Sequence, residues 1–200
     1  AFATPLGQVP VDTAVCDRLA DCPAFALSDT AHAGEHAIEI QLPFLQRTWP
    51  EATPAIVPLL VPRLAADMRE LAAEALVAAA GPDTLLMVSS DFTHYGASYG
   101  YVPFQENIPD ALDELDKGAI SRILAGDGQG LLEYGESTGI TMCGLEAAAL
   151  ALGCGLPAGF AANLVDYTRS GDRDRDYSLS VSYASILIGS GQDSPERNPA

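Results

Sequence analysis

The chain has 200 residues, nearly half of them apolar, and its 27 acidic and 10 basic side chains give a formal net charge of −17. This length and apolar content suffice to bury a full hydrophobic core, which excludes disorder for most of the chain, and the shortage of Lys and Arg excludes nucleic acid and anionic membranes as partners. No apolar run approaches the ~20 residues of a membrane span and no leader peptide is recognisable, so we expect a cytoplasmic protein.

The first part of the chain predicts mainly helices. It opens on Ala1–Thr4, which resembles the end of a strand and lacks an initiator Met, so we expect that an N-terminal portion is missing. Pro43 should kink or shorten the second of the helices, and Gly81-Pro82 should end the third. The apolar spacing predicts helices over Val11–Ala20, Glu35–Thr48 and Leu64–Ala80, with brief strands at Phe25–Leu27 and Ala55–Val61.

A central strand is predicted next, at Leu85–Val88. Four consecutive large apolar residues are typical of a strand buried on both faces. Ser89, Ser90, Asp91 and His94 follow at once. An open α/β sheet has its ligand crevice just past the carboxyl ends of its strands, so these polar groups are candidate site residues. The alternative is an ordinary strand-to-helix loop in which Asp91 caps the helix.

The remaining elements complete an α/β pattern. Alternation of strands and helices predicts a single three-layer domain over residues 1–188, with a mostly parallel central sheet flanked by helices. Residues 189–200 have little apolar content, so we expect a disordered tail. The patterns predict helices over Asn107–Leu124, Leu131–Tyr134 and Met142–Leu152, strands over Phe160–Tyr167 and Ser178–Ile188, and a charged loop over Ser170–Asp176.

Two histidines and an acid form a His-x-x-Glu-His motif. His32 and His36 are four residues apart, with Glu35 between them, as in inverted zinc proteases, where two His bind the metal and Glu is the general base. Gly34 disfavours a continuous helix there by about 1 kcal/mol. The alternative is a helix that begins at Glu35-His36, with the acid complementing the helix dipole.

Cys143 is the cysteine with the clearest chemical context. It precedes a small, apolar helix, where free N–H groups and the helix dipole favour a thiolate. A thiolate and an imidazole could share a zinc, copper or iron ion, with Asp91 or His94 beside it. A nucleophilic Cys143–His94 pair oriented by Asp91, or a packed thiol, are the alternatives. Cys16 and Cys154 lie in apolar helical contexts and are predicted to be packed thiols.

Five short blocks of sequence occur over about residues 4 to 188, namely Thr4-Pro-Leu-Gly7, Glu35-His36-Ala-Ile-Glu39-Ile-Gln-Leu-Pro-Phe-Leu45, Ser89-Ser90-Asp91-Phe92-Thr-His94-Tyr-Gly96, Ile-Thr-Met-Cys143-Gly144 and Tyr167-Thr-Arg-Ser170-Gly171-Asp172. In this order they resemble the signature segments of the Memo family, the B component of the bacterial AmmeMemoRadiSam group. Five blocks in register are far more specific than any one of them.

The resemblance implies the fold of the class III extradiol ring-cleaving dioxygenases, whose non-haem iron lies in a strand-end pocket. By position, His36 and Cys143 match metal ligands, His94 matches the general base, and Asp91 is its neighbour in the same motif. The family's further histidine ligand, in a His-Ala-Gly-Tyr-type segment upstream of Thr-Pro-Leu-Gly, has no counterpart in this sequence.

The resemblance also implies a cofactor and partners. Iron or copper is the expected metal, with zinc possible for this ligand set. A metal-dependent, dioxygenase-like oxidoreductase acting on an unknown small-molecule substrate is one expectation. A non-enzymatic adaptor that binds a peptide or protein in the same crevice is the other, and AMMECR-type and radical-SAM proteins are the implied partners.

Overall fold

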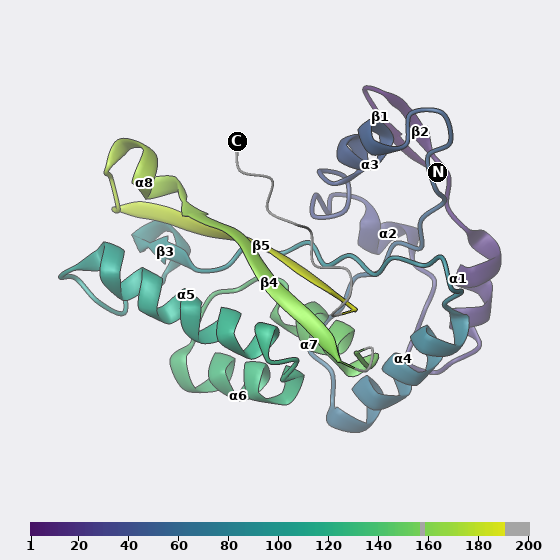
Figure 1. Ribbon diagram of the computed structural model, residues 1–200. Helices are drawn as coiled ribbons and strands as arrows, with labels where there is room; N and C mark the ends of the chain where they lie inside the picture. Colours follow the sequence, from purple (N-terminus) through teal and green to yellow (C-terminus); the bar gives the residue numbers. More distant parts are fainter. Residues whose placement is uncertain (157–158, 191–200) are drawn as a thin grey trace. The chain divides into compact units, whose positions relative to one another are not determined.

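The computed structural model describes residues 1–156 and 159–190 (Figure 1). The chain divides into two compact units, one ending at Ser89 and the other beginning at Ser90. None of the helices in the described ranges is both long and apolar enough to cross a bilayer. The predicted tail over 189–200 lies outside the described residues from 191 on, whereas Gly189 and Ser190 belong to the last strand.

The first unit begins with a small antiparallel hairpin and continues with helices. Strands β1 (Phe2–Thr4) and β2 (Gly7–Val9) pair with Phe2 opposite Val9. Asp12 caps the next helix by accepting a hydrogen bond from the N–H of Val15 at 3.0 Å. The helices of this unit are α1 (Thr13–Ala20), α2 (Asp29–His32), α3 (Leu42–Thr48) and α4 (Ala66–Ala79).

The helix predicted over Glu35–Thr48 is shorter than expected. It begins only at Leu42, with Pro43 in its first turn. A proline fits there because the first turn of a helix leaves its N–H groups without partners inside the helix. Of the two brief strands predicted in this unit, Phe25–Leu27 is not a strand, and Ala55–Val61 contributes only an isolated bridge between Val11 and Ile56.

The prediction of a central strand at Leu85–Val88 is wrong for the described structure. These residues have no strand pairing, and their exposed fractions are 69%, 48%, 44% and 38%. An apolar run indicates that a segment can be buried in a sheet, but burial also needs a pairing strand and a covering layer, and the described residues provide neither to this segment.

The second unit packs helices against one face of an antiparallel sheet (Figure 1). The sheet has the order β3-β5-β4, with β3 (His94–Gly96), β4 (Phe160–Arg169) and β5 (Leu179–Ser190). The other elements are the 3₁₀ turn η1 (Ala97–Tyr99) and the helices α5 (Ile108–Leu124), α6 (Gly128–Thr138), α7 (Leu145–Gly153) and α8 (Ser170–Asp174).

The core of the second unit lies between these helices and the sheet. Its buried members include Phe92, Ile120, Leu131 and Met142, and inward-facing side chains of β4 and β5 pack against them. The helix predicted over Asn107–Leu124 is confirmed as α5, whereas α6 is longer than the predicted Leu131–Tyr134. This core supports β3 and the residues that lead into it.

The α/β class is confirmed, but a mostly parallel sheet is not. Both described sheets pair antiparallel, and the parallel pairing found in the described ranges is the isolated Val11–Ile56 bridge. The cause is clearest between β4 and β5, where the chain returns through the short helix α8. Antiparallel strands accept such a short connection, whereas a parallel crossover needs a dozen residues or more.

Candidate functional site

The segment from Ser90 to His94 carries the candidate site of the second unit. It leads into β3, where His94 pairs with Val181 of β5. The Ser90 hydroxyl donates to the Asp91 carbonyl at 2.8 Å and accepts from the N–H of Gly144 at 2.8 Å. Gly144 is the N-cap of α7. Ser90 therefore joins this segment to the chain that carries Cys143.

The Cys143 thiol lies against the same segment. Its Sγ accepts a hydrogen bond from the backbone N–H of Asp91 at 3.3 Å and lies 3.7 Å from the Ser90 hydroxyl. The sequence predicted a thiol at the start of a helix over Met142–Leu152, but α7 begins at Leu145. In the described structure, the N–H group that donates to the sulfur belongs to Asp91. Cys143 is an exposed residue with a free thiol.

His94 is fixed to Thr141 by three hydrogen bonds. The His94 N–H donates to the Thr141 hydroxyl at 2.8 Å, and that hydroxyl donates to the His94 carbonyl at 2.9 Å. The ring Nδ1 lies 2.9 Å from the Thr141 carbonyl. Because a carbonyl oxygen can only accept, Nδ1 carries the hydrogen, and Nε2 has a free lone pair when the ring is neutral.

Asp91 faces the free nitrogen of His94. Its Oδ2 lies 3.5 Å from Nε2, and both side chains are partly exposed. A proton taken up at Nε2 would therefore face a carboxylate. The Tyr99 ring packs edge-on against the imidazole at 5.1 Å between centroids. Asp91 thus contacts His94 through its carboxylate and Cys143 through its backbone N–H.

His36 belongs to the first unit. Its side chain is 76% exposed, and Nδ1 lies 3.5 Å from a carboxylate oxygen of Glu35. That carboxylate accepts a hydrogen bond from the N–H of Ala37 at 2.8 Å, which lowers the pKa of Glu35. The structure therefore places His36 with Glu35, and the sharing of one site by His36 and Cys143 stays a prediction.

The His-x-x-Glu-His motif does not form a two-histidine helix face. Helix α2 ends at His32, and Gly34 has a φ of +113°, which turns the chain away before His36. The His32 ring instead packs edge-on against Phe2 at 6.3 Å between centroids. The helical reading of the zinc-protease motif is thus not supported.

Sequence reasoning missed Asp116 and Thr141. Asp116 of α5 is fully buried and accepts two hydrogen bonds from Thr93, which lies between Asp91 and His94. It stands four residues after Leu112 and four before Ile120, so it occupies the apolar face of α5. An acidic residue on the apolar face of a helix was the signal in the sequence that could have identified Asp116. Thr141 had no comparable signal.

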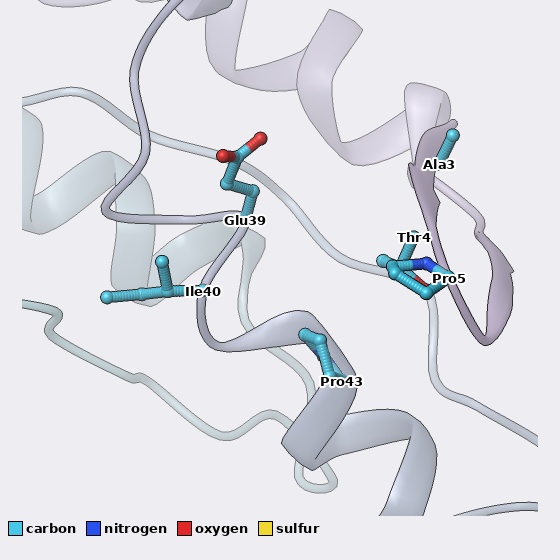
Figure 2. Close-up of a pocket in the computed structure, with 6 residues that line it drawn as sticks. All are labelled: Ala3, Thr4, Pro5, Glu39, Ile40 and Pro43. Atoms are coloured by element: carbon cyan, nitrogen blue, oxygen red, sulfur yellow. The ribbon is translucent and has the colours of Figure 1, made fainter.

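A hollow of the first unit brings two sequence blocks together (Figure 2). It has a volume of about 210 Å³, and Glu39 is the charged residue among those that line it. Next to it, the Thr4 hydroxyl donates to the side-chain oxygen of Gln46 at 2.5 Å. The predicted site residues are not among those that line the hollow, which are Ala3, Thr4, Pro5, Glu39, Ile40 and Pro43.

The side chains of the candidate site include the types that bind metals. A thiol, an imidazole and a carboxylate are ligands for iron, copper or zinc. Within the described ranges, however, no three His, Cys, Asp or Glu side chains are grouped closely enough to hold an ion. Cys143 and His36, the predicted ligands, thus fit a metal in ligand type, but neither unit by itself forms a complete ligand set from its described residues.

Comparison with known proteins identifies the family of this chain. The family model described as Memo-like protein matches residues 1–187. The chain belongs to the Memo-like family. Archaeal MEMO1 family proteins are similar to it along most of its length: one from Thermococcus kodakarensis is 36% identical and one from Pyrococcus abyssi 35%, each match covering 94% of this chain and 68% of the relative.

A more distant relative extends the comparison. A MEMO1 family protein of Methanopyrus kandleri is 33% identical over 96% of this chain and 65% of its own length. The Memo-like chain therefore spans about two thirds of the relatives that it matches. The resemblance noted on the five sequence blocks is confirmed at the level of the family.

Proposed function

We propose that this Memo-like chain contributes to a site for a redox-active metal, iron or copper, with zinc as the other ion that suits the ligands. Cys143 and His36 would hold the ion. The observation that carries the proposal is the position of the exposed Cys143 sulfur on the N–H of Asp91, beside the Asp91–His94 pair. A thiol so placed is available as a ligand and has a proton-transferring neighbour.

The roles of the protein groups follow from their hydrogen bonds. Thr141 holds the His94 ring with its Nδ1–H engaged, so Nε2 is the atom that would take or give a proton. The Asp91 carboxylate, 3.5 Å from Nε2, would orient the ring on that side. A bound iron or copper ion would supply Lewis acidity and electron transfer. We propose that such a site acts as a dioxygenase-like oxidoreductase on an unknown small-molecule substrate. The proposal includes the fold of the class III extradiol dioxygenases.

Metal analysis tests this function. The purified chain is loaded with Fe²⁺, Cu²⁺ or Zn²⁺, desalted and measured for bound metal, together with the variants Cys143→Ala and His36→Ala. Cys154→Ala and His32→Ala are matched controls, because they remove the same atoms elsewhere. We expect near-stoichiometric metal in the wild type and both controls, and loss in the two site variants. Equal metal content in Cys143→Ala and Cys154→Ala would exclude Cys143 as a ligand.

A second candidate function is that of an adaptor. The outward face of β4 and β5 exposes Val165, Tyr183 and Leu187. Exposed apolar side chains close together on a sheet favour association with another protein. AMMECR-type and radical-SAM proteins are the partners that the family suggests.

Binding measurements distinguish the two functions. A purified AMMECR-type or radical-SAM protein is titrated into the metal-free chain and into Leu187→Asp, with Ser137→Asp, an exposed residue of α6 away from this face, as the control. Binding that Leu187→Asp weakens, in a chain that takes up no metal, would favour the adaptor. Stoichiometric metal without partner binding would favour the oxidoreductase.

A further inference from the structure

Asp116 places a carboxylate in the interior of the second unit. The residue is fully buried on α5. Its Oδ1 accepts from the Thr93 N–H at 3.2 Å and from the Thr93 hydroxyl at 2.6 Å, and its Oδ2 accepts from the Tyr167 hydroxyl at 2.7 Å. Burying a carboxylate is unfavourable unless several donors satisfy it. Two of its three donors belong to Thr93, which directly precedes His94 and follows Asp91 by two residues.

The backbone N–H groups of that segment have four separate acceptors. The N–H of Asp91 donates to the Cys143 sulfur, and the N–H of Phe92 donates to the Ser182 carbonyl of β5 at 2.8 Å. The N–H of Thr93 donates to Asp116, and the N–H of His94 donates to the Thr141 hydroxyl. Four consecutive residues are therefore held in turn by Cys143, by strand β5, by Asp116 of α5 and by Thr141.

We propose that Asp116 is a positioning residue, which holds Thr93 and thereby orients the Asp91 carboxylate and the His94 imidazole on either side of it. The inference rests on the proposed role of Asp91 and His94. Among the four acceptors, Asp116 is the side chain that receives two donors from one residue of the segment, so it restrains both the backbone and the side chain of Thr93. Buried, fully satisfied acceptors of this kind restrict the conformation of the groups they hold.

The alternative is a carboxylate that only stabilises the core. Tyr167 allows the two roles to be separated, because the hydrogen bond that it donates to the same carboxylate involves no atom of the segment. Tyr167→Phe removes a hydrogen bond from Asp116 and leaves both Thr93 bonds. Thr93→Val removes the hydroxyl bond in a side chain of the same shape and keeps Asp116. Asp116→Ala removes all three bonds, and Asp116→Asn keeps one oxygen for Thr93.

Amide hydrogen exchange by NMR on the metal-free full chain tests the proposal. The readout is the exchange rate of the His94 N–H, divided by that of Ile120 in the core helix α5, together with the ¹⁵N shifts of the His94 ring. We expect the ratio to rise about tenfold in Thr93→Val, the factor of one lost hydrogen bond, and by more in Asp116→Ala, which loses both Thr93 bonds, with the Nδ1–H form of the ring no longer dominant in either variant. Asp116→Asn should restore most of the wild-type ratio, and Tyr167→Phe should leave it unchanged.

Two results would overturn the proposal. One is an unchanged ratio and ring spectrum in Thr93→Val, which keeps Asp116 and so is informative even if Asp116→Ala does not fold. The other is a change in Tyr167→Phe as large as in Thr93→Val, since that would show a general effect of the core. No metal is used, so a failure here is distinguishable from a failure to bind metal.

Discussion

The backbone N–H of Asp91 donates a hydrogen bond to the sulfur of Cys143, 52 residues further along the chain, at 3.3 Å. Both residues belong to sequence blocks that match the Memo-like family, and the bond joins those blocks in space. The thiol in turn donates to the Asp91 carbonyl at 3.8 Å, so Cys143 contacts both the N–H and the carbonyl of Asp91. The two contacts thus fix the cysteine against the polypeptide before β3.

We predict that Cys143 reacts with iodoacetamide before Cys16 and Cys154. Cys143 is exposed, whereas burial raises the pKa of Cys16 and of Cys154 and so lowers their thiolate fractions. Each unit by which a pKa is raised lowers the thiolate fraction about tenfold near neutral pH. Peptide mapping of the folded chain after brief labelling at pH 7.5 to 8 measures the order. Urea-unfolded protein is the control, and there the cysteines should react at similar rates.

We predict that His94→Ala leaves the fold intact. Two of the three bonds between His94 and Thr141 involve the His94 backbone and survive the substitution. The lost ring bond is worth about 1 kcal/mol, which corresponds to a fall of about 2–4 °C in Tm for a chain of this size. Thermal unfolding followed by circular dichroism measures it.

Thr141→Val is the comparison for that prediction. It removes both hydroxyl bonds to the His94 backbone and keeps the bond from the ring to the Thr141 carbonyl. We expect it to lower the free energy of unfolding by about 1–3 kcal/mol, more than His94→Ala does. A His94→Ala variant that unfolds at a much lower temperature than Thr141→Val would show that the imidazole is mainly structural.

Local elements of the fold could be predicted from sequence where a pattern has one physical meaning. The amphipathic spacing of 107–124 and the Gly81-Pro82 stop correspond to α5 and to the end of α4. The alternation in Ser178–Ile188 corresponds to β5. Sheet direction could not be predicted, because the pattern of strands and helices does not specify which strands pair, and the return through α8 makes β4 and β5 antiparallel.

The candidate site was predicted in part. Asp91 and His94 are three residues apart, so their contact is local and follows from the motif. The contact of Asp91 with Cys143 and the contacts of His94 with Thr141 join distant segments and depend on packing. The sequence placed Cys143 in the candidate site through its chemistry and the family resemblance. Asp116 was missed because the chain has 27 acidic residues, and one acid on the apolar face of a helix is hard to distinguish by sequence from the others.

We predict that Gly96→Ala is strongly destabilising. Gly96 ends β3 with a φ of +134°, and a Cβ there would lie 2.6 Å from the Ser178 carbonyl oxygen. Backbone strain and this close approach together should lower the free energy of unfolding by about 2–4 kcal/mol. Gly100→Ala is the matched control, since its φ is +67° but no atom lies within 4 Å of the added carbon. It should cost about 1–2 kcal/mol. Equal urea midpoints for the two variants would contradict the role of the Ser178 contact.

The phenol of Tyr167 predicts a loss of stability at high pH. Burial, followed by the charge and the hydrogen bond of Asp116, raises the pKa of Tyr167 above its usual value of 10. A group whose pKa is raised on folding contributes its stability in full below the unfolded-state pKa and loses it as the pH rises towards the folded-state pKa. The contribution of Tyr167 should therefore be complete at pH 8 and decline above about pH 10.

Comparison with Tyr167→Phe isolates this effect from the other tyrosines, several of which also have a raised pKa. Removing one donor from the buried Asp116 carboxylate should lower the free energy of unfolding by about 1–3 kcal/mol at pH 8. Between pH 8 and pH 11 the wild type should lose more stability than the variant, because only the wild type has a phenol at position 167 to deprotonate. Urea unfolding at both pH values measures the difference, and parallel pH profiles for the two proteins would show that the Tyr167–Asp116 bond does not couple folding to this proton.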